Sequence, residues 1–288
     1  RLDHVKAYNS DSHYRTYVYL ARRWVHSWGD LACSEITQEM VQSHILERHK
    51  ISGFTANKDL RYLRAAFNYG MKRKLVKSNP TEGIEFLPIE RKIRYVPTVE
   101  EINRVLDLAK PDVQDYLWVI RDTFARVGEI NRLTWDDVNF NDKYIILYTR
   151  KKRHGHLSPR KVAMTEKLYE ILSRRSVNSR SGVQWVFWQR YKDRSTGKII
   201  TGPFQYRRTI LRTLCKKAGV RYFGFHALRH SGASLMDRNN VPIGSIQRIL
   251  GHENRQTTEI YLHSIEQAER EAVAVYERAR ENSHTTLT

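Results

Sequence analysis

Apolar side chains recur at helical spacing through the first third of the chain. Five of them would form one stripe along a helix: Tyr17, Leu20, Ala21, Trp24 and Trp28. A second helix is expected to begin near Thr55, and its inward-facing residues would be Leu60, Leu63, Phe67 and Met71. The sequence Ser78-Asn79-Pro80 would end that helix. Residues 12–90 are therefore expected to be helical.

Basic residues lie off the apolar stripe of the second helix. Lys58, Arg61 and Arg64 fall between the apolar positions, and Lys72 follows near the helix end. Such a face is as typical of simple solvation as of binding to DNA. These four residues are candidate DNA contacts on this pattern alone.

A charged stretch bounded by Pro88 and Pro97 follows the helical region. Its composition is typical of a linker between domains. Thr98, with Glu101 three residues later, forms a capping-box pattern that would open a new helix. We therefore expect a helical domain over residues 1–90, a linker over 91–97 and a second domain over 98–288.

The second domain is expected to be mostly helical with a small β insertion. Tyr144 to Thr149 and Lys161 to Met164 are rich in β-branched and aromatic residues, and residues 150–159, with Gly155 and Pro159, would form a hairpin loop between them. Apolar spacing predicts helices over residues 99–109, 113–124, 128–133, 166–175, 204–218, 227–238, 243–249 and 266–281. The expected fold class is mainly α with a small antiparallel β-sheet.

The charge distribution indicates what this fold binds. The chain has 288 residues, 40% of them hydrophobic, and a net charge of +19. From Arg150 to Lys217 it holds 19 Lys and Arg against three acids, a net of +16, whereas residues 1–90 hold 14 against 10. A basic middle between near-balanced ends favours a nucleic-acid surface over a merely soluble, lysine-rich one.

Several protein classes are disfavoured by the composition. Two cysteines, Cys33 and Cys215, lie far apart, so neither a disulfide framework nor a Cys/His zinc cluster is indicated. This usage fits a reducing compartment. No apolar run is long enough to span a membrane. No signal peptide is evident, and the chain opens on Arg1 instead of methionine, as a fragment would.

The last part of the chain carries polar residues suited to phosphate chemistry. Cleaving a phosphodiester needs a nucleophile, positive charge on the non-bridging oxygens and a proton for the leaving oxygen. Arg126 and Arg229 could supply the charge, because a guanidinium donates two parallel hydrogen bonds and stays ionised. His226 and His252 could move protons or bind phosphate oxygen, and Tyr261 could attack. Each residue alone has an ordinary explanation, such as a surface ion pair or a helix cap.

The four-residue spacing of His226 and His230 also fits zinc ligands on one helix face. The residues between them are Ala-Leu-Arg, without the glutamate of the metalloprotease pattern, and the arginine would repel a cation. We expect no metal and no cofactor.

Four motifs in this order resemble the tyrosine recombinase family, the phage-integrase type of site-specific recombinase. They are Ala-Arg-Val-Gly-Glu at 125–129, His-Ala-Leu-Arg-His at 226–230, Leu-Gly-His at 250–252, and Tyr261 nine residues after His252. The resemblance covers about residues 93–280, and residues 12–90 match more loosely the helical core-binding module of the family. The resemblance implies a DNA clamp of two domains, a core-binding domain followed by a catalytic domain.

The resemblance also implies catalytic roles. Tyr261 would attack the scissile phosphate and become joined to the 3′-phosphate of DNA. Arg126 and Arg229 would hold the charge of the transition state, His226 would help move the tyrosine's proton, and His252 would hydrogen-bond the phosphate. The protein–DNA bond would conserve the phosphodiester energy, so that neither ATP nor metal is needed.

Supporting residues are implied in the same way. Glu129 would support the site and orient Arg126 or its helix. The family takes a hairpin lysine as general acid for the 5′-hydroxyl. The hairpin here holds two adjacent lysines, and we assign this role to Lys151, with Lys152 second. Further candidate DNA contacts are Arg150, Arg153, Arg207, Arg208 and Arg212.

The partners follow from the same resemblance. They are a double-stranded DNA recombination site and a homo-tetramer in the synaptic complex, with room for accessory DNA-bending proteins. The amphipathic pattern from Ser264 to Glu281 would dock on a neighbouring protomer, or pack on its own domain. The enzyme would integrate or excise a mobile element in the cytoplasm, at a prokaryotic nucleoid or in a phage-infected host.

Three alternatives stay open. They are a DNA-binding protein that has lost catalysis, a relaxing topoisomerase and a telomere resolvase. Many integrases carry an arm-binding domain at the N-terminus. None is visible in this sequence, and the missing methionine leaves open that one was removed.

Overall fold

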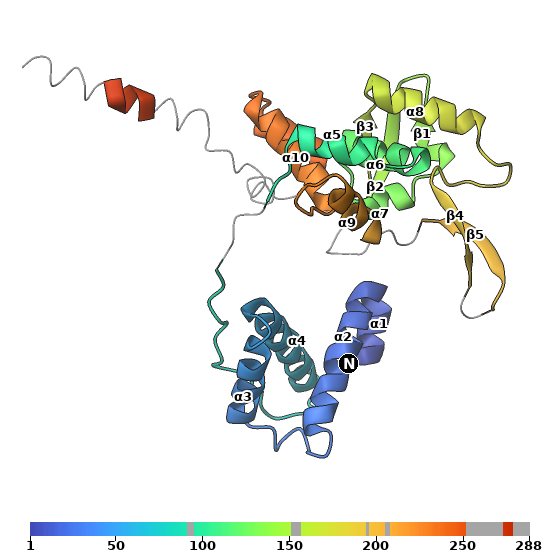
Figure 1. Cartoon of the computed structure of the whole chain (residues 1–288). Helices are drawn as coiled ribbons and strands as arrows, with labels where there is room; N and C mark the ends of the chain where they lie inside the picture. The colour runs from blue at the N-terminus through green and yellow to red at the C-terminus, as the bar shows by residue number, and fades with distance from the viewer. Residues whose placement is uncertain (91–94, 151–156, 194–195, 205–207, 252–272, 279–288) are drawn as a thin grey trace, which may run out of the picture. The chain divides into compact units, whose positions relative to one another are not determined.

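The computed structural model describes residues 1–90, 95–150, 157–193, 196–204, 208–251 and 273–278, apart from the side chains of Arg150 and Arg208. The chain divides into two compact units, Arg1–Ile93 and Arg94–Thr288 (Figure 1). Each unit has its own hydrophobic core. Among the described residues, no helix is both long enough and apolar enough to cross a membrane.

The described part of the N-terminal unit contains four helices: α1 (Leu2–Tyr8), α2 (Asp11–Trp28), α3 (Gln38–His49) and α4 (Gly53–Lys72). The last three begin at a hydroxyl side chain. Ser10, Thr37 and Ser52 each accept a hydrogen bond from the backbone N–H three residues later. These bonds satisfy donors that have no partner inside the helix, and so they fix where each helix begins.

The predicted apolar stripes form most of this unit's core. Tyr17, Leu20, Trp24 and Trp28 of α2 are buried, as are Leu60, Leu63 and Phe67 of α4. The prediction for Met71 is wrong. This residue lies in the last turn of α4, lines an open hollow with Arg64 and Asn68, and is 39% exposed. The helix prediction also fails after Lys72, since residues 73–90 form turns and irregular chain.

One buried carboxylate connects three helices of the N-terminal unit. Asp59 of α4 accepts hydrogen bonds from the Trp24 indole N–H of α2 (2.7 Å) and from Arg48 Nε of α3 (2.9 Å). Burial alone would raise the pKa of the Asp59 carboxyl. The His44 imidazole, 3.5 Å from the carboxylate, the hydrogen bond from Trp24 and the positive charge of Arg48 outweigh burial and lower this pKa.

The second unit is mostly helical, as predicted. Its described helices are α5 (Val99–Asp107), α6 (Pro111–Thr123), α7 (Val127–Asn131), α8 (Glu166–Val177), α9 (Arg208–Lys217), α10 (Phe225–Arg238) and α11 (Ile243–Leu250), with a 3-10 turn at Trp135–Asp137. The capping box at Thr98 and Glu101 is confirmed by both of its hydrogen bonds. Of the helix predicted over residues 266–281, the described residues 273–278 are helical.

A three-stranded antiparallel sheet contains the predicted hairpin. Its order is β1 (Val138–Asn139), β2 (Tyr144–Arg150) and β3 (Leu157–Ala163). The strands are longer than predicted, because Arg150 pairs with Leu157. Pro159, expected in the loop, instead lies in β3 opposite Tyr148. β3 is an edge strand of the sheet, where a proline's missing N–H need not break the ladder.

A second hairpin, β4 (Trp188–Lys192) paired with β5 (Ile199–Pro203), was not predicted. It projects from the body of its unit (Figure 1). Its strands alternate weakly between polar and apolar residues, and Arg190, Lys192 and Ile199 are exposed. A strand without a buried face carries little of the alternation from which strands are predicted.

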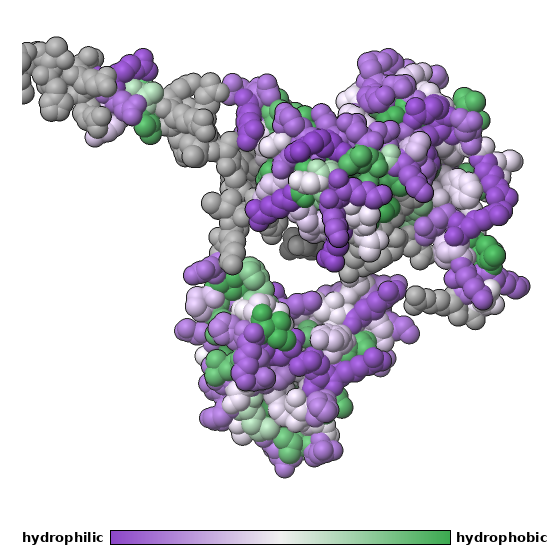
Figure 2. Space-filling model, in the orientation of Figure 1, coloured by the Kyte–Doolittle hydropathy of each residue, from purple (hydrophilic) through white to green (hydrophobic). Residues whose placement is uncertain are grey.

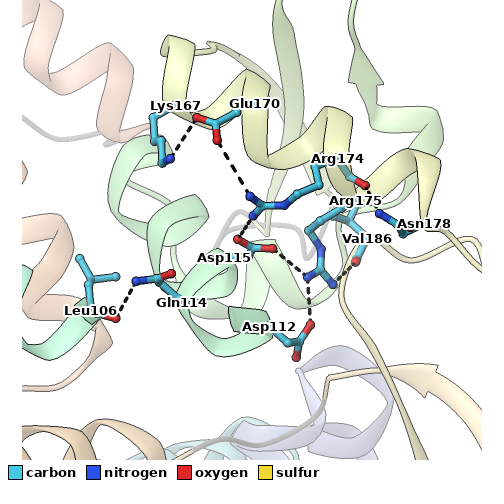
Figure 3. A network of polar contacts seen from close by, with 10 residues as sticks. All are labelled: Leu106, Asp112, Gln114, Asp115, Lys167, Glu170, Arg174, Arg175, Asn178 and Val186. Carbon is cyan, nitrogen blue, oxygen red and sulfur yellow. Dashed lines mark hydrogen bonds and ion pairs between the residues drawn. The ribbon is translucent and has the colours of Figure 1, made fainter. Parts of the chain in front are cut away.

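Helix α6 lies at the centre of the second unit, in contact with α5, α8 and α10. Tyr116 of α6 is fully buried, edge-on to Phe187, Phe204 and Phe225. At the N-terminal end of α6, Asp112 and Asp115 pair with arginines of α8 (Figure 3). The face visible in Figure 2 is largely hydrophilic in both units, with scattered apolar spots, as expected when most apolar side chains are in the two cores.

Candidate active site

Arg126 lies at the corner between two helices. Helix α6 ends at Thr123 and is capped by Phe124, whose backbone adopts a left-handed conformation (φ 50°), and Arg126 is the N-cap of α7. The backbone N–H of Arg126 and its Nη1 atom each donate to the Glu129 carboxylate at 3.1 Å. The Arg126 side chain is 38% exposed. Its guanidinium is therefore held at one end by a buried carboxylate and remains accessible to solvent.

The Glu129 carboxylate joins the Arg126 corner to the sheet. It also accepts hydrogen bonds from the Thr149 hydroxyl of β2 (2.8 Å) and from Nη2 of Arg160 in β3 (2.9 Å). Burial alone would raise the pKa of Glu129. The charge of Arg160 and the hydrogen bonds from Thr149, Arg160 and the Arg126 backbone outweigh burial and lower it. Glu129 is therefore ionised at neutral pH, and it binds the Arg126 side chain directly.

Arg229 connects the Arg126 corner to the end of α11. Its side chain, in α10, is fully buried. Nη1 donates to the carbonyl oxygen of Phe124 at 2.5 Å, and Nη2 donates to the carbonyl oxygen of Leu250. Phe124 precedes Arg126 by two residues, and Leu250 precedes His252 by two. One buried guanidinium thus links the chain just before Arg126 with the chain just before His252.

The same region requires a glycine in α10. A Cβ at Gly232 would lie 2.2 Å from the ring of Phe124. The absence of a side chain lets the ring pack directly on the helix that carries Arg229. This contact supports the left-handed turn from which Arg126 projects.

His226 and His230 lie together on α10. Their rings are 5.2 Å apart and perpendicular, and His230 is buried. The prediction that both share one helix face is confirmed. Among the residues that the structure describes, no group of His, Cys, Asp and Glu side chains could hold a metal ion.

Helix α11 ends at Leu250, one residue after the predicted end. Gly251 caps it in the left-handed conformation (φ 63°). The neighbouring carbonyl of Ile249 accepts a hydrogen bond from Nη1 of Arg160 at 2.7 Å. The end of α11 is thus tied to β3 as well as to α10.

Several predicted site residues lie outside the described residues. They are Lys151, Lys152, Arg153, Arg207, His252 and Tyr261, together with the side chains of Arg150 and Arg208. Their catalytic and DNA-binding roles remain predictions. The structure brings together Arg126, Glu129 and, through main-chain carbonyls, Arg229.

The predicted DNA contacts of α4 are not equivalent. Lys58, Arg61 and Lys72 are exposed. Arg64 is half-buried, and its Nη2 donates to the carbonyl oxygens of Thr81 (3.1 Å) and Ile84 (2.5 Å), which fastens the chain after α4 to the helix. In the second unit, exposed Arg212 lies over the ring of Tyr222. The binding of DNA by these residues stays a prediction.

Arg160 and Thr149 were not predicted from the sequence as members of the site. Arg160 is one of 19 basic residues between positions 150 and 217, and nothing local distinguishes it from the others. Its partners are 31 and 89 positions away in the chain. The one available signal was its place on the strand that follows the predicted hairpin loop.

Comparison with known proteins agrees with this geometry. The profile of the phage integrase family matches residues 96–268. The chain is 25% identical over 239 residues to a tyrosine recombinase of Pseudothermotoga lettingae, covering 82% of this chain and 79% of the relative. It is 28% identical over 251 residues to tyrosine recombinase XerA of Thermococcus kodakarensis, covering 86% and 83%.

Solved structures share the fold. The Tn1549 transposon integrase in complex with transposon right end DNA matches with a TM-score of 0.69 and 18% identity, over 96% of this chain and 97% of that one. A lambda integrase dimer bound to a core site matches with a TM-score of 0.69 and 15% identity, over 88% and 72%. The chain therefore belongs to the phage integrase family and is a tyrosine-type site-specific recombinase, an enzyme that cleaves and rejoins DNA strands.

Proposed function

We propose that this recombinase attacks DNA with Tyr261 and that Arg126, His226, Arg229 and His252 complete the site around the scissile phosphate. The arrangement of the two arginines carries the proposal. Buried Arg229 binds main-chain carbonyls two residues before Arg126 and two residues before His252. Three separate motifs of the sequence are therefore anchored by one side chain.

The reaction follows from these groups. The Tyr261 oxygen bonds to phosphorus while its proton passes to His226, and the bond from phosphorus to the 5′-oxygen breaks. The leaving 5′-oxygen takes a proton from Lys151, for which Lys152 is the second candidate. The products are a 3′-phosphotyrosine ester and a free 5′-hydroxyl. Attack by another strand's 5′-hydroxyl reverses the steps and rejoins the DNA.

Electrostatics decide how much the arginines contribute. Charge accumulates on the non-bridging oxygens as tyrosine attacks, and a fixed guanidinium stabilises that charge without reorganisation. Removing one such donor costs about 100- to 1000-fold in rate. Arg229 is held by two carbonyls and Arg126 by Glu129. Both are therefore oriented before DNA arrives.

We assign the helical N-terminal part, residues 1–90, to a core-binding domain, residues 91–97 to a linker and residues 98–288 to the catalytic domain. Two such domains would clamp double-stranded DNA, and four protomers would assemble on two sites. Residues 264–281 would form the helix that docks on a neighbour. A lambda integrase tetramer bound to a Holliday junction is one solved relative of this kind.

We further propose that the enzyme integrates or excises a mobile element. The structural relatives include a transposon integrase, whereas the curated relatives include XerA and XerC recombinases. To separate integration from resolution, plasmids carrying two direct copies of one selected site are compared with pairs of non-identical sites. Efficient exchange of non-identical sites supports the proposal. Exchange confined to identical sites would replace it with a resolution function.

Strand cleavage is tested with a suicide substrate. A bound duplex is first selected from random double-stranded DNA with the Tyr261→Phe variant and is then nicked beside the scissile position. The native protein should form an adduct on a denaturing gel, and Tyr261→Phe should bind the duplex without forming one. Tyr276→Phe is the matched control, because Tyr276 is 65% exposed in a described helical segment. An unchanged adduct in Tyr261→Phe would overturn the assignment, and specific binding without any adduct would indicate a silent DNA-binding protein.

A further inference from the structure

Arg160 is a nearly buried arginine to which the proposed reaction gives no task. It lies on β3, and its side chain is 12% exposed. One end of its guanidinium fork, Nη2, donates to Glu129 at 2.9 Å. The other end, Nη1, donates to the carbonyl oxygen of Ile249 at 2.7 Å. A single planar group therefore spans from the carboxylate that holds Arg126 to the last turn of α11.

The end of α11 is held by two arginines from different elements. Arg160 binds the carbonyl of Ile249, and Arg229 binds the carbonyl of the next residue, Leu250. Carbonyls in the last turn of a helix have no partner within the helix and carry the negative end of its dipole. The two guanidinium groups donate hydrogen bonds to these carbonyls, and their positive charge compensates the negative end of the dipole. The next residues in the sequence are Gly251 and then His252.

Gly251 lets Arg160 come this close to the helix end. A Cβ on Gly251 would lie 2.8 Å from Cδ and 3.0 Å from Nε of Arg160. The backbone of Gly251 also has a positive φ of 63°, which disfavours other residues. Two features therefore favour glycine at position 251: the left-handed backbone conformation and the close packing of the Arg160 side chain.

We propose that Arg160 is a positioning residue that couples Glu129 and Arg126 to the main chain leading into His252. The inference rests on the proposed active site. Glu129, which accepts a hydrogen bond from Arg160, also accepts one from Thr149 of β2. Thr149 lies two residues before Lys151 in the sequence. The corner, the hairpin and the end of α11 are then held as one assembly. Without the two hydrogen bonds of Arg160, the catalytic groups can shift relative to one another, although the helix or strand that carries each group stays folded.

Two substitutions isolate this bridge. Arg160→Gln removes the charge and the fork, and we expect the rate of adduct formation at saturating DNA to fall by on the order of 100-fold, as small misplacements of catalytic groups do. DNA affinity should change little. Arg160→Lys keeps the charge, but a single ammonium cannot serve two separated acceptors in the same way. We expect it to restore part of the lost rate.

Arg175 provides a matched control. It lies on α8, its side chain is 16% exposed, and it binds the carboxylates of Asp112 (2.9 Å) and Asp115 (3.3 Å) and the carbonyl of Val186 (3.3 Å), as Figure 3 shows. Like Arg160, it joins a carboxylate to a main-chain carbonyl within the same unit. Arg175→Gln should lower the melting temperature without a specific loss of cleavage rate at a temperature where the variant is folded.

Hydrogen exchange gives a readout independent of activity. In the full chain, Arg160→Gln should accelerate exchange at both residues 126–129 and 249–251, while Arg175→Gln should leave both segments unchanged. Unchanged exchange at either segment in Arg160→Gln would overturn the coupling. A loss of DNA affinity with a normal rate at saturation would make Arg160 a DNA contact instead. Absence of an adduct in the native protein would refute the proposed reaction, whereas the exchange result would still decide the coupling.

Discussion

The Glu129 carboxylate receives hydrogen bonds from three elements: the corner at Arg126, β2 through Thr149 and β3 through Arg160. Its two oxygens accept four donors, and its side chain is 3% exposed. An ionised carboxylate in this position compensates two guanidinium groups. A neutral amide would have to present its own N–H groups to one of them.

Glu129→Gln should therefore destabilise the catalytic unit by about 3 kcal/mol, as expected for breaking a buried ion pair. The pKa of Glu129 is lowered in the folded protein, so its contribution is fully present above the ordinary value of 4.5 and is lost as pH falls through the lowered value. Chemical unfolding between pH 6 and pH 3 measures this. The native chain should lose more stability over that range than the variant. Equal losses would mean that Glu129 is not held in its ionised form.

At the scale of elements, the end of α11 offers a comparison of two glycines. Gly251 and Gly219 share a φ of 63°, but a Cβ on Gly219 would meet nothing within 4 Å, whereas one on Gly251 would collide with Arg160. Both substitutions to alanine should cost about 1 kcal/mol for the strained backbone. Only Gly251→Ala should also slow adduct formation at saturating DNA. Equal rates in the two variants would show that the contact with Arg160 is not needed.

In the N-terminal unit, Asp59 is the corresponding junction between helices. Asp59→Ala leaves Arg48 buried without its carboxylate and Trp24 without its acceptor. We expect the unit to lose about 3 kcal/mol. Hydrogen exchange of α3 and α4 should accelerate while that of α6 stays unchanged. Protection of α3 and α4 equal to that of the native chain would contradict the role given to Asp59.

Elements with a periodic apolar face could be predicted from the sequence. The spacing of apolar residues predicted helices α2 and α10 and the β2–β3 hairpin, and the capping box at Thr98 predicted the start of α5. The β4–β5 hairpin could not, because its exposed residues hide the alternation. The predicted start of β3 was wrong because Pro159 was assigned to the loop. A proline is expected in a loop unless the strand is known to lie at the edge of a sheet.

The site divides in the same way. Arg126, Glu129 and Arg229 belong to motifs whose order is visible in the sequence, and the structure joins them. Arg160 belongs to no local pattern, because its significance comes from partners far along the chain. Arg64 resembled its basic neighbours in sequence, yet its guanidinium binds carbonyls of its own unit. The sequence shows that each of these arginines carries a positive charge, but it does not show which group that charge binds.

At the scale of the whole molecule, a net charge of +19 should make DNA binding steeply dependent on salt. Lys58→Ala and Arg61→Ala should each reduce the slope of log affinity against log salt by about one, as expected for a lost phosphate contact. Arg64→Ala should leave the slope nearly unchanged and instead destabilise the chain after α4. Binding titrations at several salt concentrations test this. A slope reduced as much in Arg64→Ala as in Arg61→Ala would contradict it.

The central claim concerns the atom that becomes bonded to DNA. After reaction with the nicked duplex, the adduct is digested with trypsin, and the peptide carrying the nucleotide is identified by mass spectrometry. Cleavage after Arg255, Arg270 and Arg278 separates the two C-terminal tyrosines into residues 256–270, with Tyr261, and residues 271–278, with Tyr276. The nucleotide is expected on the first peptide, through a 3′-phosphate on Tyr261. Its attachment to the second peptide, or to any other residue, would contradict the account.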